Sequence, residues 1–187
     1  IDINRRQIIS LFLYGSLFPV YAKEVPDINL TSNLMIGSAF NKFSESYYGV
    51  FDINGVSDFD HQDILKATKE TSYRGPDDSG FYKDQNCIIG FNRLSIVDLK
   101  AKSQPLVNEQ KDIVLVCNGE IYNYMSLKKI LEKKYEFKTN MDTEVLLHGY
   151  QEWGDEIWKK ASGMFSVVLY DKNQKRIKLI RDHAGIK

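Results

Sequence analysis

The chain has 187 residues, which at roughly 100–200 residues per domain leaves room for one domain and short extensions. Its 43% hydrophobic and 27% charged residues are ordinary for a globular domain and argue against disorder, collagen or coiled coil. The 25 Lys and Arg residues balance the 25 Asp and Glu residues, so no net positive charge favours nucleic acid or acidic lipid as a partner.

The first segment, residues 1–22, has an apolar middle that follows the pair Arg5-Arg6 and ends near Ala22. This layout is that of a secretory signal peptide, and paired arginines also suit a twin-arginine export signal. Sequence upstream of the true start, or an apolar extension packed on the core, is the alternative. The segment is shorter than the about 20 residues of a comfortable membrane span, so none is expected.

Residues 23–46 are rich in Asn, Ser and Asp and are expected to form a linker. Because the chain begins at Ile1 and stops soon after a strand-like stretch, we expect a fragment at both ends, with a domain over residues 47–187 that is truncated at its C-terminal end.

The domain itself shows the hydrophobic pattern of a compact mixed α/β fold. Its first half predicts a strand over Tyr48–Ile53, a helix over His61–Thr71, a loop over Arg74–Gly80, and strands at Phe81-Tyr82 and Cys87–Phe91 joined by Lys83–Asn86. Its second half predicts a strand buried on both faces at Ile113–Cys117, helices marked by Leu127, Ile130 and Leu131 and by Val145, Leu146, Tyr150 and Trp153, and a hairpin of Met164–Tyr170 and Ile177–Ile180. Strands beside strands, with helices grouped between them, indicate a layered sandwich rather than a parallel barrel.

The run Asn118-Gly119-Glu120-Ile121-Tyr122-Asn123 follows the buried strand directly, so we expect it where a strand end opens. The backbone N–H of Gly119 beside the side-chain amide of Asn118 would supply the donor pair that an oxyanion hole needs. An ordinary Asn-Gly turn is the alternative.

Two charged residues could hold a small zwitterion. Arg93 ends the Cys87–Leu94 stretch and could grip a carboxylate with two parallel hydrogen bonds, although an ion pair with Asp98 is the alternative. Asp142 lies at a helix start and could hold an ammonium group, or it could cap the helix, with Gly154 just beyond the other end.

The remaining reactive residue types give no site. Cys87 and Cys117 lie in apolar strands and are expected to be inert packing residues. The three histidines are scattered, and neither a serine nucleophile motif nor the spacing of a metal site is present in the sequence, so no metal is expected.

Eight runs, taken in order, resemble the class II glutamine amidotransferase domain of glutamine-dependent asparagine synthetases. They are Gly49–Ile53, Arg74–Asp77, Arg93–Asp98, Gln104-Pro105, Asn118–Asn123, Asp142–Val145, Gly163–Phe165 and Arg181–Lys187. The resemblance implies an α+β fold, the N-terminal-nucleophile hydrolase four-layer αββα sandwich. It also implies glutamine as substrate, hydrolysed to supply ammonia for the ATP-dependent amidation of aspartate.

Site roles follow from the same resemblance. Arg93 would bind the α-carboxylate of glutamine, Asp142 its α-ammonium, and Asn118 with Gly119 would form the oxyanion hole, with Glu120 and Asn123 completing the pocket. No cofactor is implied in this domain, since ATP and Mg belong to a C-terminal synthetase domain of the same protein. That domain is an implied partner, and the resemblance allows a homodimer.

The nucleophile of the resembled family is a cysteine at the first position of the mature chain, activated by its own α-amino group. Counted back from Gly49, we assign that position to Glu45, which is neither a thiol nor terminal. Either the natural start is altered here, or the domain is a glutaminase-dead module for glutamine binding or scaffolding. The resemblance implies a cytoplasmic location, and the apolar N-terminal segment implies export as the alternative.

Overall fold

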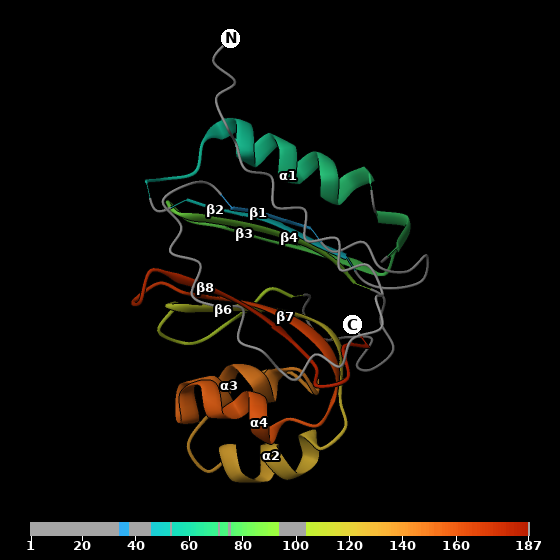
Figure 1. The fold of residues 1–187 in the computed structure, drawn as a ribbon, viewed down its shortest axis with the longest axis vertical. Coiled ribbons are helices and arrows are strands. Elements are labelled where there is room, and N and C mark those ends of the chain that lie inside the picture. The colour runs from blue at the N-terminus through green and yellow to red at the C-terminus, as the bar shows by residue number, and fades with distance from the viewer. Residues whose placement is uncertain are drawn as a thin grey trace. The chain divides into compact units, whose positions relative to one another are not determined.

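The computed structural model describes residues 34–37, 46–52, 54–70, 72–74, 76–93 and 104–186 (Figure 1). These divide into two compact units, one up to Arg93 and one from Gln104. Each unit has a four-stranded antiparallel sheet and at least one helix, so the α+β class is confirmed. The signal-like segment over residues 1–22 lies outside the described residues.

The sheet of the first unit has the strand order β1-β2-β4-β3. Its strands are β1 (Leu34–Gly37), β2 (Ser46–Phe51), β3 (Asp78–Lys83) and β4 (Cys87–Arg93). Strand β1 falls within residues 23–46, where composition predicts a linker, and the structure pairs it with β2. Strand β3 begins at Asp78, so the prediction of a loop through Gly80 is wrong for its last three residues.

Helix α1 (Asp58–Glu70) begins three residues before the predicted start at His61. The reason is a reciprocal cap: the Ser57 backbone N–H donates to the Asp60 carboxylate at 2.8 Å, and the Asp60 N–H donates to the Ser57 hydroxyl at 3.2 Å. A short 3-10 turn, η1 (Ser72–Arg74), follows the helix.

Packing of α1 on its sheet depends on a glycine in β4. A Cβ atom at Gly90 would lie 2.1 Å from the Thr68 hydroxyl, so only glycine permits this approach. The side-chain amide of Asn92 donates to the Thr68 carbonyl at 2.8 Å, next to a core of Val50, Ile64 and Ile88.

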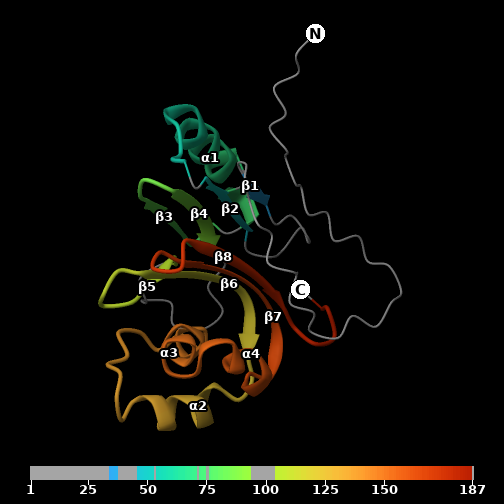
Figure 2. The ribbon, with the colours of Figure 1, turned by 60° about the vertical axis from the view of Figure 1, so that its left-hand side comes forward.

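The sheet of the second unit has the strand order β5-β6-β7-β8 (Figure 2). Its strands are β5 (Leu106–Val107), β6 (Ile113–Ile121), β7 (Gly163–Asp171) and β8 (Arg176–Arg181). Its helices are α2 (Tyr124–Leu131), α3 (Glu144–Trp153), η2 (Gly154–Glu156) and α4 (Ile157–Lys160).

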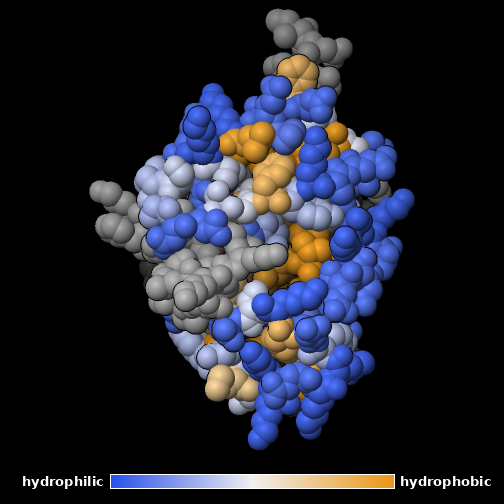
Figure 3. Space-filling model, turned by 180° about the vertical axis from the view of Figure 1, so that it is seen from behind, coloured by the Kyte–Doolittle hydropathy of each residue, from blue (hydrophilic) through white to orange (hydrophobic). Residues whose placement is uncertain are grey.

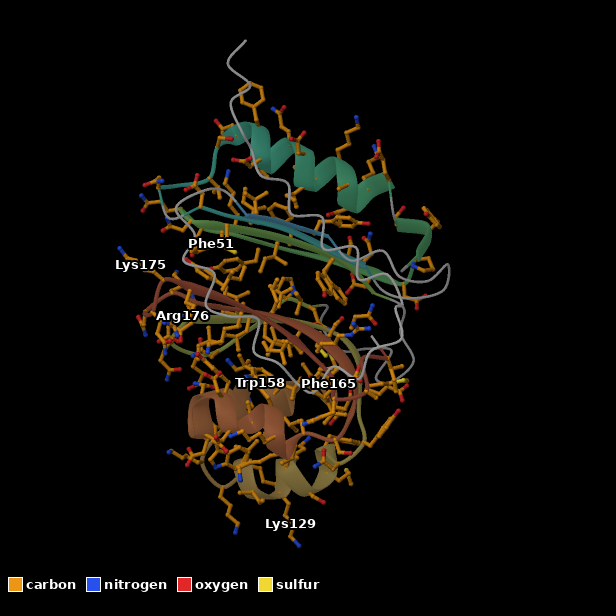
Figure 4. The ribbon with its side chains drawn as sticks, in the orientation of Figure 1. Phe51, Lys129, Trp158, Phe165, Lys175 and Arg176 are labelled. Atoms are coloured by element: carbon orange, nitrogen blue, oxygen red, sulfur yellow. The ribbon has the colours of Figure 1, made fainter. Side chains whose placement is uncertain are left out.

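The core of this unit lies between its sheet and its helices, where Trp158 and Phe165 are buried (Figure 4). Residues Ile113–Cys117 are all buried, which confirms a strand covered on both faces. The predicted helix stripe is wrong at Ile130, which is 55% exposed, because the α2 turn presents Leu127 and Leu131 inward instead.

Hydrophilic residues predominate on the face of the molecule shown in Figure 3, with smaller hydrophobic areas between them. Within the described part of the chain, no helix combines the length and the apolar character needed to cross a membrane.

Candidate functional site

Strand β6 carries three of the predicted site residues, Asn118, Gly119 and Glu120, and it does not end before Asn118. It continues to Ile121, with Asn118 opposite Ser166 and Gly119 opposite Phe165 in β7. The prediction that the strand ends at Cys117 is therefore wrong, and so is the alternative of a simple Asn-Gly turn. Asn118 is 4% exposed. Because neighbouring strand residues face opposite ways and Cys117 packs in the helix-side core, the Asn118 side chain belongs to the other face.

Gly119 is required by its backbone and by its neighbour strand. Its φ is +148°, and a Cβ atom there would lie 2.0 Å from the carbonyl oxygen of Met164. Across the pair, a Cβ atom at Gly163 would lie 2.0 Å from the carbonyl oxygen of Glu120. The two glycines therefore permit the close approach of β6 and β7, and Gly119 adds no side chain of its own over its backbone.

Asp142 joins this end of β6 through a direct hydrogen bond. Its Oδ2 accepts the backbone N–H of Ile121 at 2.6 Å. The prediction that Asp142 caps α3 is wrong, since Thr143 occupies the N-cap position and makes no side-chain cap bond. The carboxylate accepts a hydrogen bond from β6 instead, next to Glu120 in the same strand.

The electrostatics of Asp142 set it apart from a surface carboxylate. Burial raises its pKa above the ordinary value, and the charge of Glu120 adds to the rise, while backbone hydrogen bonds such as that of Ile121 oppose it. A half-buried, negatively charged side chain beside a second carboxylate favours a cationic ligand, because a nearby positive charge relieves the cost of both.

Asn123 has a structural contact in this arrangement. Its amide nitrogen donates to the Lys160 carbonyl at 2.8 Å, and its amide oxygen accepts the Ser162 N–H at 2.9 Å. The side chain thus fixes the start of α2 to the segment before β7. Its predicted contact with substrate stays a prediction.

Two predicted site residues are not among the described residues of the second unit. Arg93 ends β4 in the first unit, in register with Asp78, and its role as carboxylate ligand stays a prediction. Its alternative partner Asp98 and the proposed nucleophile position Glu45 are outside the described residues.

Both cysteines are fully buried free thiols, which confirms that they are packing residues. Burial, together with the charge of Asp84, raises the pKa of Cys87 well above its ordinary value. A thiol in that state is poorly suited to act as a nucleophile, because the reactive form is the thiolate.

Sequence reasoning missed two buried side chains that hold this end of the sheet. Gln104 is 2% exposed and makes two hydrogen bonds to the backbone of Cys117, at 2.8 and 2.5 Å. The Asp182 carboxylate accepts the N–H groups of Phe165 at 3.2 Å and of Ala184 at 3.0 Å. The Gln104 bonds span 13 residues and the bond from Phe165 to Asp182 spans 17, so only the placement of Gln104 and Asp182 in motif runs could have signalled these contacts.

Among the described residues, no group of three or more His, Cys, Asp and Glu side chains is arranged to hold a metal ion. The end of β6 offers amide donors and carboxylates: N–H groups that can donate to a ligand oxygen, and an anion that can bind an ammonium group.

Comparison with known proteins connects this geometry to one family. The family model described as "Glutamine amidotransferase domain" matches residues 48–187, and Glu45 precedes the matched range. The chain is 43% identical over 141 residues to the glutamine-hydrolyzing asparagine synthetase B of Escherichia coli, covering 75% of this chain and 26% of the relative. It is 46% identical over 125 residues to the glutamine-hydrolyzing asparagine synthetase 2 of Bacillus subtilis, covering 66% of this chain and 17% of that relative.

A plant relative gives the same picture. The chain is 42% identical over 123 residues to the glutamine-hydrolyzing asparagine synthetase of Zea mays, covering 66% of this chain and 21% of the relative. The chain thus spans 26% or less of the length of these three relatives.

Proposed function

This chain belongs to the glutamine amidotransferase domain family, and from this premise we propose that it binds glutamine at the end of β6 as the front domain of an asparagine synthetase-like protein. In that protein, ammonia taken from glutamine would be used by a C-terminal synthetase domain, with ATP and Mg, to amidate aspartate. The names of the three relatives support this, since each is a glutamine-hydrolyzing asparagine synthetase.

The hydrogen bond from Ile121 to Asp142 is the observation that carries the proposal. It attaches a half-buried carboxylate to the same end of β6 that carries Asn118 and Gly119. This end of the strand therefore offers an anion and a pair of amide donors. Glutamine needs both: its α-ammonium would pair with Asp142, and its side-chain amide oxygen would accept from Asn118 and Gly119. Arg93 would receive the α-carboxylate.

In this proposal, the position assigned to the nucleophile of the hydrolytic step holds Glu45 instead of a cysteine. Neither Glu45 nor Tyr48, the first residue of the family match, is a cysteine, and both thiols of the chain are buried. These observations favour a second candidate function, in which the domain binds glutamine without hydrolysing it and serves as a binding or scaffolding module of an amidating enzyme.

Calorimetric titration of the full chain with glutamine tests the binding site. We expect Asp142→Asn to weaken binding at least about tenfold, since a partly buried charge pair contributes more than about 1.4 kcal/mol. Asp63→Asn, the same change at an exposed position of α1, is the matched control and should bind like the unmodified chain. Equal affinity in all three proteins would exclude Asp142 as the ammonium ligand.

Glutamate release from glutamine separates the two candidate functions. The full chain is compared with a chain that starts at residue 45 and carries Glu45→Cys, and with one that starts at residue 48 and carries Tyr48→Cys, each checked for folding by circular dichroism. Turnover by a trimmed chain alone indicates an intact pocket that lacks only its nucleophile. Turnover by the full chain that survives Cys87→Ser and Cys117→Ser would contradict a cysteine mechanism altogether.

The cellular location follows from the same proposal. Amidation of aspartate needs ATP, so we place the protein in the cytoplasm, with export through the apolar N-terminal segment as the alternative. N-terminal sequencing of the mature protein decides between them, because cleavage before Lys23 would support export.

A further inference from the structure

One edge of β6 is completed by side chains instead of a strand. In the described part of the chain, β5 pairs with β6 only at Val114 and Leu115. Backbone groups of alternate residues in a strand point to the same edge. The carbonyl of Ile113 accepts from Asn108 on the β5 side, so the backbone groups of every second residue from Ile113 to Ile121 face this edge.

Gln104 acts as a substitute strand residue at the next position. Its Nε2 donates to the Cys117 carbonyl at 2.8 Å, and its Oε1 accepts the Cys117 N–H at 2.5 Å. A single side-chain amide thus satisfies both backbone groups, as the peptide of a neighbouring strand would. Only an amide provides a donor and an acceptor at this spacing, since a carboxylate only accepts.

Asp142 likewise satisfies a backbone group of this edge: its carboxylate accepts the N–H of Ile121, two positions beyond Gly119 in the strand. The backbone N–H and carbonyl of Gly119 therefore face the edge between two side chains, one from Gln104 and one from Asp142. Gly119 is partly exposed, whereas Gln104 and Cys117 are buried. Among the described residues whose backbone faces this edge, from Ile113 to Ile121, Gly119 is the one that is partly exposed.

We propose that Gln104 is a positioning residue for the recognition of the glutamine side-chain amide: by fixing both backbone groups of Cys117, it holds the Asn118 side chain and the Gly119 N–H in place to receive the amide oxygen. This role rests on the proposed function. Gln104 itself touches no substrate, and it acts through the two residues that follow Cys117 in the strand.

Two matched variants separate this role from stability alone. Gln104→Met keeps the volume of the side chain but removes both hydrogen bonds to β6. Asn108→Ala removes another buried amide bonded to β6, whose Oδ1 accepts the Ile113 N–H at 3.0 Å at the opposite end of the strand. Both variants should lower the melting temperature, so any difference between them reports position and not overall stability.

Amide hydrogen exchange of the ligand-free full chain, followed by NMR, is the first measurement. In Gln104→Met we expect the amide of Cys117 to exchange at least about tenfold faster than in Asn108→Ala, relative to the amides of β7, because this amide loses its hydrogen bond to Gln104. Equal exchange in the two variants would overturn the positioning role, whether or not glutamine binds.

Binding of two ligands is the second measurement. The probes are glutamine and 2-aminopentanoate, which has the same α-amino acid end but no side-chain amide. Gln104→Met should weaken glutamine about tenfold and leave 2-aminopentanoate unchanged, while Asn108→Ala changes neither. An equal loss for both ligands, or no loss for glutamine, would refute the proposal. If the unmodified chain does not bind glutamine, the proposed function fails, and hydrogen exchange still decides the role of Gln104 in the strand.

Discussion

At the scale of single residues, Asp142 shows how binding chemistry opposes stability. Its pKa lies above the ordinary value of 3.8 in the folded chain, mainly because of burial. The folded state therefore holds this proton more tightly than the unfolded state, and stability falls as the pH rises from 3.8 through the folded pKa. At pH values above the folded pKa, the buried negative charge lowers the stability by its full amount. A bound cationic ligand would reduce this loss.

Asp142→Asn should remove this penalty, since an amide oxygen can still accept the Ile121 N–H. We expect a melting temperature at about pH 7 that equals or exceeds that of the unmodified chain, with the difference shrinking toward about pH 3. Circular dichroism melts across this pH range provide the test. A clearly lower melting temperature at neutral pH would mean that the charge itself stabilises the fold.

At Gly119, near this end of β6, we expect any side chain to be costly. Alanine there combines a positive φ with a backbone contact at 2.0 Å, so we expect Gly119→Ala to lower the free energy of unfolding by more than about 3 kcal/mol. Gly154→Ala is the matched control, because Gly154 also has a positive φ but has open space around it, and about 1–3 kcal/mol is expected there. Urea titrations of both variants measure the difference, and equal losses would exclude the contact with β7 as a cause.

At the scale of elements, the sequence pattern correctly predicts the strands that are continuous apolar runs. It does not predict the strand residues that are polar. The buried run before Asn118 and the β7–β8 hairpin follow from hydrophobic pattern alone. The continuation of β6 through Asn118 and Gly119 does not, because both residue types favour turns and only pairing with β7 keeps them extended. The start of α1 was readable in the Ser57–Asp60 spacing, which is that of a capping box.

In the candidate site, too, the sequence indicates some residues but not their long-range contacts. The motif runs point to Asn118, Gly119 and Asp142, and the structure bonds Asp142 to Ile121, two residues beyond Gly119 in the same strand. The partner of Asp142 could not be read, since a carboxylate at a helix start has the same local pattern whether it caps the helix or bonds to a strand 21 residues away. Long-range bonds of this kind depend on tertiary packing.

Glu144 holds the segment before α3 in place. Its buried carboxylate accepts the N–H groups of Lys138 and Thr139, each at 2.8 Å, and the Thr139 hydroxyl at 2.6 Å. Burial alone raises its pKa, but hydrogen bonds from His148, Thr139 and Lys138 outweigh it, so the pKa is lowered overall. The stability that Glu144 contributes is therefore present above 4.5, its ordinary value, and is lost as the pH falls through the folded pKa.

Glu144→Ala should cost about 3 kcal/mol of unfolding free energy at neutral pH, because three partly buried hydrogen bonds lose their acceptor. The cost should shrink in acid, where the unmodified chain loses the same contribution. Urea titrations at several pH values give the comparison, with the exposed Glu136→Ala as control. A cost independent of pH would point to lost packing instead of the ionised hydrogen-bond network.

At the scale of the whole molecule, each of the two units has its own sheet, its own core and one buried thiol. Cys87 lies in β4 of the first unit, and Cys117 lies in β6 of the second. Because a thiol reagent reaches a buried cysteine only when its surroundings open, Cys87→Ser and Cys117→Ser each leave a probe of one unit.

Gly90→Ala should act on the first unit, since the added methyl group would collide with Thr68 of α1. We expect labelling of Cys87 to accelerate at least about tenfold, and labelling of Cys117 to change much less, if the units open separately. Labelling rates in native buffer, measured in the two single-cysteine backgrounds, provide the test. Equal acceleration of both thiols would show that the units open as one.

The side-chain cover along β6 also bears on association between copies of the chain. An uncovered strand edge is a template on which a strand from another molecule can add, and this is a common start of aggregation. Gln104 and Asp142 interrupt the β6 edge on both sides of Gly119. The stretch of edge left at Gly119 can pair with a single amide group but not with an extended peptide. The same arrangement that would bind a small ligand should therefore also prevent a strand of another molecule from adding to the sheet.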